Sequence, residues 1–358
     1  MFGAGLGTSG ELDSSVRITV SSPVQVGSWN NWKPVAGAYG TAGLRAGRLY
    51  MTGANIPNPP GWMIRSSPVQ VGSDGDWSMI ALSPAIYVGG GIRGGRLFVW
   101  GESYDGALGL GSTYLTSSPT QVGSATDWSF ITFGYKTAFG IRAGKLYAWG
   151  ANNSGVCGVG TNYGVVPSYS SPVQVGALTD WSFVNTGSYG AHAIRGGRLY
   201  GWGENFYGVI GNGVSPGSVD SYSSPVQIGA DTDWVSVVNG AYSNYGMRKP
   251  GRIYAWGYNW IGQLGIGNLI DRSSPVQIGS AKDWTYLASN YASAGYSSVF
   301  GIRDGRLYAW GADGYGRLGL GTFGVARSSP VQVGSETDWV SASVGANHTI
   351  MVRRPPVP

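Results

Sequence analysis

Short segments of β-forming residues, in which side chains alternate with a period of two, recur along the chain. In Leu146–Trp149, small or aliphatic residues alternate with aromatic ones, as in a strand whose successive side chains point to opposite faces. Ala-Gly, Gly-Gly and Asp-Gly pairs separate many of these segments and are typical of two-residue hairpin turns. No stretch of 10 or more residues has helical periodicity. The pattern predicts an all-β protein.

One unit of this pattern predicts four strands. They are strand A at 128–133, strand B at 137–142, strand C at 145–149 and strand D at 171–175. Strand D begins with the dipeptide Ser171-Pro172. Proline cannot donate to a sheet ladder, so this position predicts that strand D is an outer, edge strand.

The unit is repeated around the chain. The segment S-P-V-Q-[VI]-G occurs seven times, with Thr120 in place of valine in one copy. A tryptophan follows each of its prolines after nine residues: Trp32, Trp77, Trp128, Trp181, Trp234, Trp284 and Trp339. The period of 45 to 55 residues suits one four-stranded propeller blade. The sequence therefore predicts a seven-bladed β-propeller with four antiparallel strands per blade, as a single domain over residues 1–358.

The two ends of the chain complement one another. The last unit contains strand A at Trp339 and strand B at 348–353 but ends before strand C. Residues 1–12 are a degenerate copy of the block W-G-x-N-x-x-G-x-L that precedes S-P-V-Q elsewhere. We therefore expect residues 1–26 to complete the closing blade, so that both termini share it and the sheet edges are hidden. On this interpretation no tail, catalytic domain or anchor lies outside the propeller.

The topology sorts the loops onto two faces. The D–A linkers and B–C turns share one face, called face one, and the A–B and C–D loops share the other, called face two. Spacing is nearly constant on face one, whereas loop lengths vary on face two. Variable loops on a rigid frame are the usual place for recognition, which makes face two the candidate binding face.

Face two is nearly uncharged and rich in aromatic and amide side chains. Such residues suit flat polar ligands such as sugars, or a protein partner. The alternative is packing between blades, which we expect for the repeat-constant Trp149, Trp202, Trp256 and Trp310. The candidate binding residues are Tyr104, Asn152, Asn153, Asn205, Phe206, Tyr207, Tyr258, Asn259, Trp260 and Tyr315.

Face one carries most of the basic residues. Two cations flank each full B–C turn and could form a basic ring that attracts phosphate, but acids of the D–A linkers, such as Asp127 and Asp180, lie on the same face. Solvated Arg–Asp pairs that organise the blade ends are the second interpretation. The candidate ring is Arg93, Arg96, Arg142, Lys145, Arg195, Arg198, Arg303 and Arg306.

Composition narrows the class of protein. The 358 residues include 62 glycines and only 11% charged residues, which excludes a charge-rich disordered chain and a charged coiled coil. A net charge of +5 is mild for this length, so basicity gives no reason to expect a nucleic-acid partner. No apolar run reaches the ~18 residues of a membrane span, and no secretory signal follows Met1. We expect a soluble protein without a signal peptide.

The residues favour no catalytic or metal site, and no cofactor is expected. Only two histidines exist, and His348 and His192 are interpreted as structural groups at blade tips. The single Cys157 excludes an internal disulfide framework. The string Gly106–Gly111 lacks the Gly-Lys-Ser/Thr ending of a phosphate loop. We therefore predict that the protein is not an enzyme.

The repeated blocks resemble those of the regulator of chromosome condensation family. The resemblance is clearest in Trp256–Gly265 and in Gly345–Thr349, where that family commonly has Gly-x-x-His-Thr. It implies a seven-bladed β-propeller. It implies no single function, because the same ring serves nucleotide exchange, light sensing, ubiquitin-ligase scaffolding and viral structure.

The near-identical repeats and low charge are similar to those of family members encoded by bacteriophages and environmental bacteria. This resemblance implies a non-enzymatic virion protein, a tail or capsid appendage that binds other virion or surface proteins, or host glycan. The alternatives are a guanine-nucleotide exchange factor or chromatin binder, and a glycan-binding lectin outside a virion. The Gly-Trp-Arg-His-Thr repeats of the plant ultraviolet-B photoreceptor are absent. Ligand, host and copy number stay open.

Overall fold

The computed structural model describes most of the chain. The described residues are 1–6, 19–25, 33–37, 40–56, 63–162, 165–188, 190–214, 221–290 and 296–354. Trp32 and most of the N-terminal block that the closure argument used, residues 7–12, lie outside them, as do parts of the longest loops of face two.

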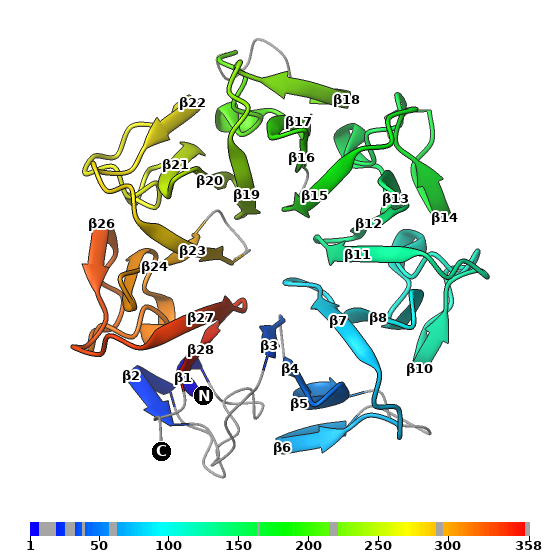
Figure 1. Cartoon of the computed structure of the whole chain (residues 1–358), viewed down its shortest axis with the longest axis horizontal. Helices are drawn as coiled ribbons and strands as arrows, with labels where there is room; N and C mark the ends of the chain where they lie inside the picture. The colour runs from blue at the N-terminus through cyan, green and yellow to red at the C-terminus, as the bar shows by residue number, and fades with distance from the viewer. Residues whose placement is uncertain are drawn as a thin grey trace.

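The fold is a ring of seven sheets, each with four antiparallel strands (Figure 1). This confirms the predicted seven-bladed propeller. Strand A is the innermost strand of each blade (Figure 1); in chain order from blade 1 to blade 7, these strands are β3 (Lys33–Ala36), β7 (Trp77–Leu82), β11 (Trp128–Phe133), β15 (Trp181–Thr186), β19 (Trp234–Asn239), β23 (Trp284–Ser289) and β27 (Trp339–Val344). Strand B follows as β4 (Gly40–Arg45), β8 (Val88–Arg93), β12 (Thr137–Arg142), β16 (Gly190–Arg195), β20 (Ser243–Arg248), β24 (Ser298–Arg303) and β28 (His348–Arg353).

The outer half of each blade consists of strands C and D. Strand C, for blades 1 to 7, is β5 (Arg48–Ile56), β9 (Arg96–Gly101), β13 (Lys145–Ala151), β17 (Arg198–Glu204), β21 (Arg252–Gly257), β25 (Arg306–Gly311) and β1 (Phe2–Leu6). Strand D is β6 (Met63–Gln70), β10 (Thr116–Gln121), β14 (Ser168–Gln174), β18 (Ser221–Ile228), β22 (Arg272–Gln277), β26 (Arg327–Gln332) and β2 (Thr19–Gln25).

Blade 3 shows how closely the pattern predicted the strands. Strands A and B coincide with the predicted 128–133 and 137–142. Strand D, however, begins at Ser168, three residues before the predicted start, so Pro172 lies inside it. The proline is tolerated because β14 is the edge strand of its sheet, and the register of β13 against β14 shifts between Ala148 and Gly150.

The closing blade is assembled from both ends of the chain, as predicted. Its strand order is β2-β1-β28-β27. The N-terminal strand β1 is antiparallel to β28, with Phe2 opposite Met351 and Gly5 opposite His348. Figure 1 shows both termini beside this blade. The ring is thus closed by hydrogen bonds between the first and last strands.

The hydrophobic core lies between successive blades. One cluster joins Phe139 and Cys157 of blade 3 to Trp181 and Trp202 of blade 4. The strand-A indole packs edge-to-face on the aromatic residue of strand C, with ring centroids 5.3 Å apart for Trp181 and Tyr200. Each blade depends on its neighbours for burial, as in other repeat proteins.

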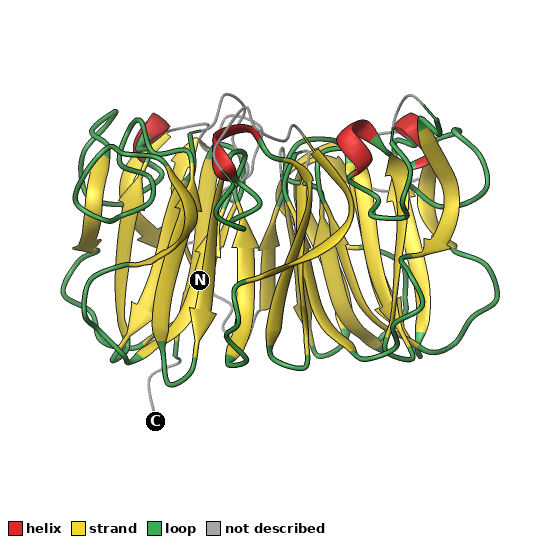
Figure 2. Cartoon of the chain, turned by 90° about the horizontal axis from the view of Figure 1, so that it is seen from above, coloured by secondary structure: helices red, strands yellow, loops and turns green. Residues whose placement is uncertain are grey.

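The loops confirm the predicted hairpins and separate the two faces. Ala143 and Gly144 form a B–C turn with φ of 48° and 72°, the left-handed pair of a type I′ turn. Short 3-10 turns follow strand C at one rim of the propeller (Figure 2). These turns are η1 (Tyr104–Gly106), η2 (Asn153–Gly155), η3 (Phe206–Gly208) and η5 (Gly314–Gly316). Within the described parts of the chain, no helix is long and apolar enough to cross a membrane.

Candidate functional site

An aromatic rim follows the 3-10 turns of face two. Trp260 is 71% exposed, and Tyr104, Phe206, Tyr207 and Tyr315 are exposed as well. The turn backbone fixes these side chains: Tyr207 and Tyr315 have φ of 58° and 60°, in the left-handed region that non-glycine residues rarely occupy. Such backbone strain persists only where the surrounding structure holds it.

Three predicted binding residues are buried instead. Asn152, Asn205 and Asn259 are each 0% exposed. Their side-chain Oδ1 atoms accept hydrogen bonds from the backbone N–H five residues later, at Cys157 (3.1 Å), Ile210 (3.2 Å) and Leu264 (2.9 Å). The prediction that these asparagines are accessible was therefore wrong, because they satisfy the backbone of the C–D turn. They occupy the same place in three repeats, three residues after the strand-C tryptophan, which fits a scaffold role.

The other two predicted residues are partly covered. Asn153 and Tyr258 are half-buried. Tyr258 joins a chain of aromatic contacts, at centroid distances of 4.5 Å from Tyr207 and 6.4 Å from Trp260. Tyr242 extends it, 5.4 Å from Tyr207. Burial raises the pKa of the Tyr258 phenol, and the neighbouring Tyr207 adds to this effect.

The resulting cluster crosses two blades. Tyr207 belongs to the C–D turn of blade 4, whereas Tyr242, Tyr258 and Trp260 belong to blade 5. Tyr242 was missed because it lies on an A–B loop outside the repeated blocks. The contacts fix the rings before any partner arrives, so little side-chain entropy remains to be lost on binding.

Exposed apolar groups are concentrated on face two. Of the nineteen exposed large hydrophobic residues in the described chain, thirteen lie on its loops. Contiguous apolar groups mark interaction sites, and Tyr207 and Trp260 are contiguous through Tyr258. The thirteen are Tyr104, Tyr114, Leu115, Val165, Phe206, Tyr207, Trp260, Leu269, Ile270, Tyr296, Tyr315, Phe323 and Val325.

A charged contact lies on the same face between blades 2 and 3. Lys136 Nζ is 3.1 Å from Asp105 Oδ2, and it lies 5.7 Å from the ring centroids of both Tyr104 and Tyr135. The hydrogen bond to Asp105 raises the pKa of Lys136. Both partners are partly exposed, so the contact orients Tyr104 rather than adding much stability.

The basic residues of face one divide into two groups. The first cation of each B–C turn in the candidate ring pairs with an acid of the D–A linker: Arg93 with Asp74, Arg142 with Asp127, Arg195 with Asp180 and Arg303 with Asp283. The guanidinium groups of Arg93, Arg142 and Arg303 also lie over aromatic rings, as Arg303 does at 5.5 Å from Tyr308. Half of the candidate ring is therefore charge-compensated and organises the blade ends.

Among the second cations of these turns, Arg96 and Arg198 are exposed, whereas Lys145 and Arg306 are partly buried. Arg306 pairs with Asp304 of its own turn. Within the described residues, no carboxylate lies within 4.0 Å of Arg96, Lys145 or Arg198. Within the candidate ring, the uncompensated charge is therefore limited to these three separated positions.

The two histidines are buried at blade junctions. His192 Nε2 donates to the carbonyl of Ile210 (3.1 Å), and Asn239 Nδ2 of the next blade donates to His192 Nδ1 (2.8 Å). His348 Nε2 is 3.1 Å from Thr41 Oγ1 of blade 1. Burial lowers the pKa of both to about 4. It also raises the pKa of Cys157 to about 12, which leaves the thiol protonated and unreactive.

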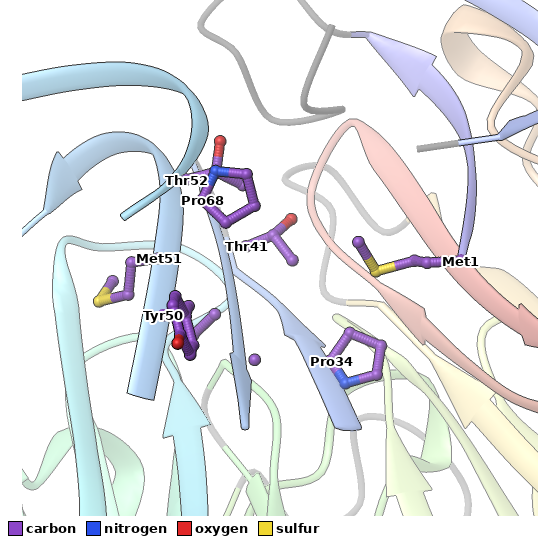
Figure 3. A pocket seen from close by; sticks show the side chains of 9 residues that line it. Met1, Pro34, Thr41, Tyr50, Met51, Thr52 and Pro68 are labelled. Atoms are coloured by element: carbon purple, nitrogen blue, oxygen red, sulfur yellow. The ribbon is translucent and has the colours of Figure 1, made fainter. Parts of the chain in front are cut away.

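No metal site is found among the described residues, and the cavity beside the closing blade is small. No group of three or more His, Cys, Asp or Glu side chains among the described residues could hold a metal ion. A cavity beside the closing blade, lined by Met1, Pro34, Thr41, Thr52 and Pro68 among others (Figure 3), has a volume of about 10 Å³. That is room for one water molecule at most.

Fold and site together define a seven-bladed repeat propeller with one aromatic face and one face of Arg–Asp pairs. Five segments of the chain match the Regulator of chromosome condensation (RCC1) repeat, at residues 94–139, 143–193, 196–245, 250–300 and 304–352. These segments cover well over half of the sequence. The chain therefore belongs to the RCC1 repeat family.

Curated relatives are similar over part of their length. The Ultraviolet-B receptor UVR8 of Arabidopsis thaliana is 30% identical over 173 residues, which are 45% of this chain and 36% of that protein. Protein RCC2 of Homo sapiens is 30% identical over 163 residues, 43% of this chain and 30% of that protein. The chain thus spans well under half the length of these relatives.

Solved structures confirm the architecture. Human WBSCR16 superposes with a TM-score of 0.82 at 17% identity, over 99% of both chains. Prp20p of Saccharomyces cerevisiae, described together with its binding to Gsp1p and histones, superposes with a TM-score of 0.84 at 15% identity, over 99% of this chain and 92% of that one. At such identities the likeness concerns the fold alone.

Proposed function

We propose that the protein is a non-catalytic binding propeller that holds a protein partner against face two. The observation that carries this proposal is the concentration of thirteen of nineteen exposed large hydrophobic residues on the loops of that face. Monomeric soluble proteins rarely gather apolar groups in this way without an interaction.

The chemistry of the aromatic rim supports a protein partner. Tyrosine and tryptophan provide a large contact area with few rotatable bonds, and the centre of such interfaces is depleted in charge. Trp260, Tyr258 and Tyr207 contact one another in series, so the partner meets an ordered surface. Prp20p, which has the same fold, is described with two protein partners.

Photo-crosslinking tests this proposal. A photoreactive phenylalanine derivative replaces Trp260 or Tyr315 on face two, or Arg198 on face one as a matched exposed control, in cells that naturally make the protein. We expect a discrete crosslinked species from both face-two positions and none from Arg198. Equal crosslinking from Arg198, or none from face two, would overturn the proposal.

The virion setting is the finer part of the proposal. It depends on the resemblance to phage-encoded family members and assigns the partner to a tail or capsid. Mass spectrometry of purified particles from the source organism tests it: we expect the chain at a fixed ratio to the major capsid protein. Its absence from particles would leave the binding propeller but reject the virion role.

A further inference from the structure

Two similar pockets open on the outer flank of the propeller, away from the aromatic rim. One lies between blades 2 and 3 and has a volume of about 430 Å³; the other lies between blades 5 and 6 and has about 350 Å³. Both volumes fall within the range of small-ligand sites, about 300 to 1,000 Å³. The junctions lie on opposite sides of the ring, beside β10 and β14 and beside β22 and β26 (Figure 1).

The pockets are built from the same repeat positions. In each, the preceding blade contributes a glutamine and the D–A linker after it, Gln121–Ala125 or Gln277–Ala281. The following blade contributes one residue from each of strands A, B and C, and the Ser-Pro pair of strand D. These residues are Trp128, Arg142, Tyr147, Ser171 and Pro172 in one pocket, and Trp284, Arg303, Tyr308, Ser329 and Pro330 in the other.

The arginine of each pocket is oriented by its neighbours. Arg142 Nε is 2.7 Å from Asp127 Oδ1, and its guanidinium carbon lies 5.8 Å from the Tyr147 ring centroid. Arg303 Nε is 3.6 Å from Asp283 Oδ1, and its guanidinium carbon lies 5.5 Å from the Tyr308 ring. Because the bound acid compensates the charge, the terminal N–H groups are hydrogen-bond donors in a nearly neutral pocket.

Aromatic walls beside neutral donors suit one ligand class. We propose that these flank pockets are saccharide-binding subsites, each sized for a single sugar ring. The partly exposed ring of Tyr147 or Tyr308 contacts C–H groups of the pyranose, while the arginine N–H groups and the Ser171 or Ser329 hydroxyl bind ring and hydroxyl oxygens. Trp128 and Trp284 are buried and form the floor beneath the tyrosine. A neutral hexose needs no counter-charge and fits the compensated arginine better than an anionic ligand does.

The spacing of the pockets determines which ligands can engage both of them. Since they lie on opposite sides of the ring, one monosaccharide cannot occupy both, whereas a surface that displays many glycans engages both and gains avidity through the second binding event. The flank sites are independent of face two, so a protein partner there and a sugar at the flank are compatible.

Ligand-observed NMR and pocket-filling variants test this proposal. Glucose, galactose, mannose and N-acetylglucosamine at millimolar concentration are screened by saturation transfer against the intact chain. We expect at least one hexose to give a saturation-transfer signal, and the double variant Ser171→Trp/Ser329→Trp to reduce it at least tenfold, because both serines are exposed residues lining the pockets.

The matched control is the double variant Val69→Trp/Val331→Trp, which adds the same two indoles on exposed strand-D positions that line neither pocket. It should keep the wild-type signal. Absence of any signal from all four sugars would overturn the proposal, as would a signal that persists when both pockets are filled. Face-two crosslinking is unaffected by either result, so this inference and the proposed function fail separately.

Discussion

The junctions between interior blades and the junction between blade 6 and the closing blade 7 use different side chains to donate to the same backbone carbonyl of the C–D turn. At three interior junctions, the strand-C tryptophan donates from Nε1 to a C–D turn carbonyl of the preceding blade: Trp149 to Ala107 (3.0 Å), Trp202 to Val156 (2.8 Å) and Trp256 to Val209 (2.9 Å). Trp310 of blade 6 is equally buried, but its Nε1 has no hydrogen-bond partner among the described residues. At the closing blade, the Thr349 hydroxyl donates to the equivalent carbonyl of Arg317 (3.0 Å).

The reason for the exchange is the identity of residue 4. In the closing blade, Ala4 of strand C lies opposite Thr349 of strand B. In blade 3, the equivalent strand-C residue is Trp149, which lies opposite Ala138. The closing blade therefore lacks an indole, and the long side chain of Arg317 joins blades 6 and 7 instead. Its N–H groups donate to Ser298 Oγ (2.6 Å), the Ala346 carbonyl (2.6 Å) and the Tyr296 carbonyl (3.0 Å).

The comparison teaches that one fold closes its junctions by two physical means. Interior junctions depend on apolar area and packing, which contribute in proportion to the surface buried. The closing junction depends on buried hydrogen bonds, whose net contribution is small when complete but whose partial loss is costly. Burial lowers the pKa of Arg317 to about 10, opposed by nearby Asp313, so the group stays charged at neutral pH.

The largest effect is expected from an interior indole. Trp256→Ala removes a fully buried side chain and leaves a cavity, which costs about 3 to 5 kcal/mol of unfolding free energy for a tryptophan. The Val209 carbonyl keeps a second donor, Asn244 Nδ2 at 2.7 Å, so most of the loss is packing. Urea denaturation at neutral pH measures it; a loss below 1 kcal/mol would mean that the interior junctions do not depend on the indole.

The closing junction is expected to lose less overall but to open first. Arg317→Met keeps the length of the side chain but removes the donors to the Ala346 and Tyr296 carbonyls and the positive charge near the buried Asp313. We expect a loss of about 2 to 3 kcal/mol of unfolding free energy. Hydrogen exchange should then become fastest in β1 and β28, while the amides of β15 and β16 stay protected. Uniform loss of protection would contradict a distinct closing junction.

The repeated parts of this comparison could be predicted from the sequence. Strands A and B of blade 3 coincide with the pattern because constant spacing reflects a constant backbone, and the closing blade followed from matching the two incomplete ends. The role of Arg317 could not be predicted, because its position holds Ala107, Val156 and Val209 in other blades and its side-chain partners come from two distant segments, at 296–298 and at Ala346.

The candidate binding face was predicted less well, for a related reason. Asn152 and Asn259 have the polarity of surface residues, and only the three-dimensional path of the turn shows that their oxygens face inward. Tyr242 and Tyr296 lie on A–B loops that have no repeated motif, so no spacing argument could select them. Residues whose role depends on a loop path are the ones that a sequence pattern cannot resolve.

A pH titration compares one interior junction with one closing contact. His192 and His348 have a pKa of about 4 when folded, below the ordinary value of about 6.5, so the unfolded chain binds more protons between these values. Stability should therefore fall as the pH drops from about 6.5 to 4, by about 2 kcal/mol per histidine at pH 5. Denaturation midpoints across this range measure the slope.

Single variants separate the two sites. His192→Gln should remove the pH dependence that arises at the junction of blades 4 and 5. His348→Gln should remove the pH dependence that arises at the contact with Thr41 of blade 1. Each variant should halve the slope of stability against pH. An unchanged slope in the double variant would assign the acid sensitivity to carboxylates instead.

The smallest effect on stability is expected at Trp260, four residues after Trp256, where the largest is expected. Trp260 is 71% exposed, whereas Trp256 in the same blade is fully buried, so Trp260→Ala should change the unfolding free energy by less than about 0.5 kcal/mol. The same substitution should weaken partner capture on face two, because it removes the most exposed ring of the aromatic cluster. Urea denaturation and crosslinking from Tyr315 in this variant measure the two effects separately. A large loss of stability would show that Trp260 belongs to the packing between blades, and the division between core and rim tryptophans would then fail in blade 5.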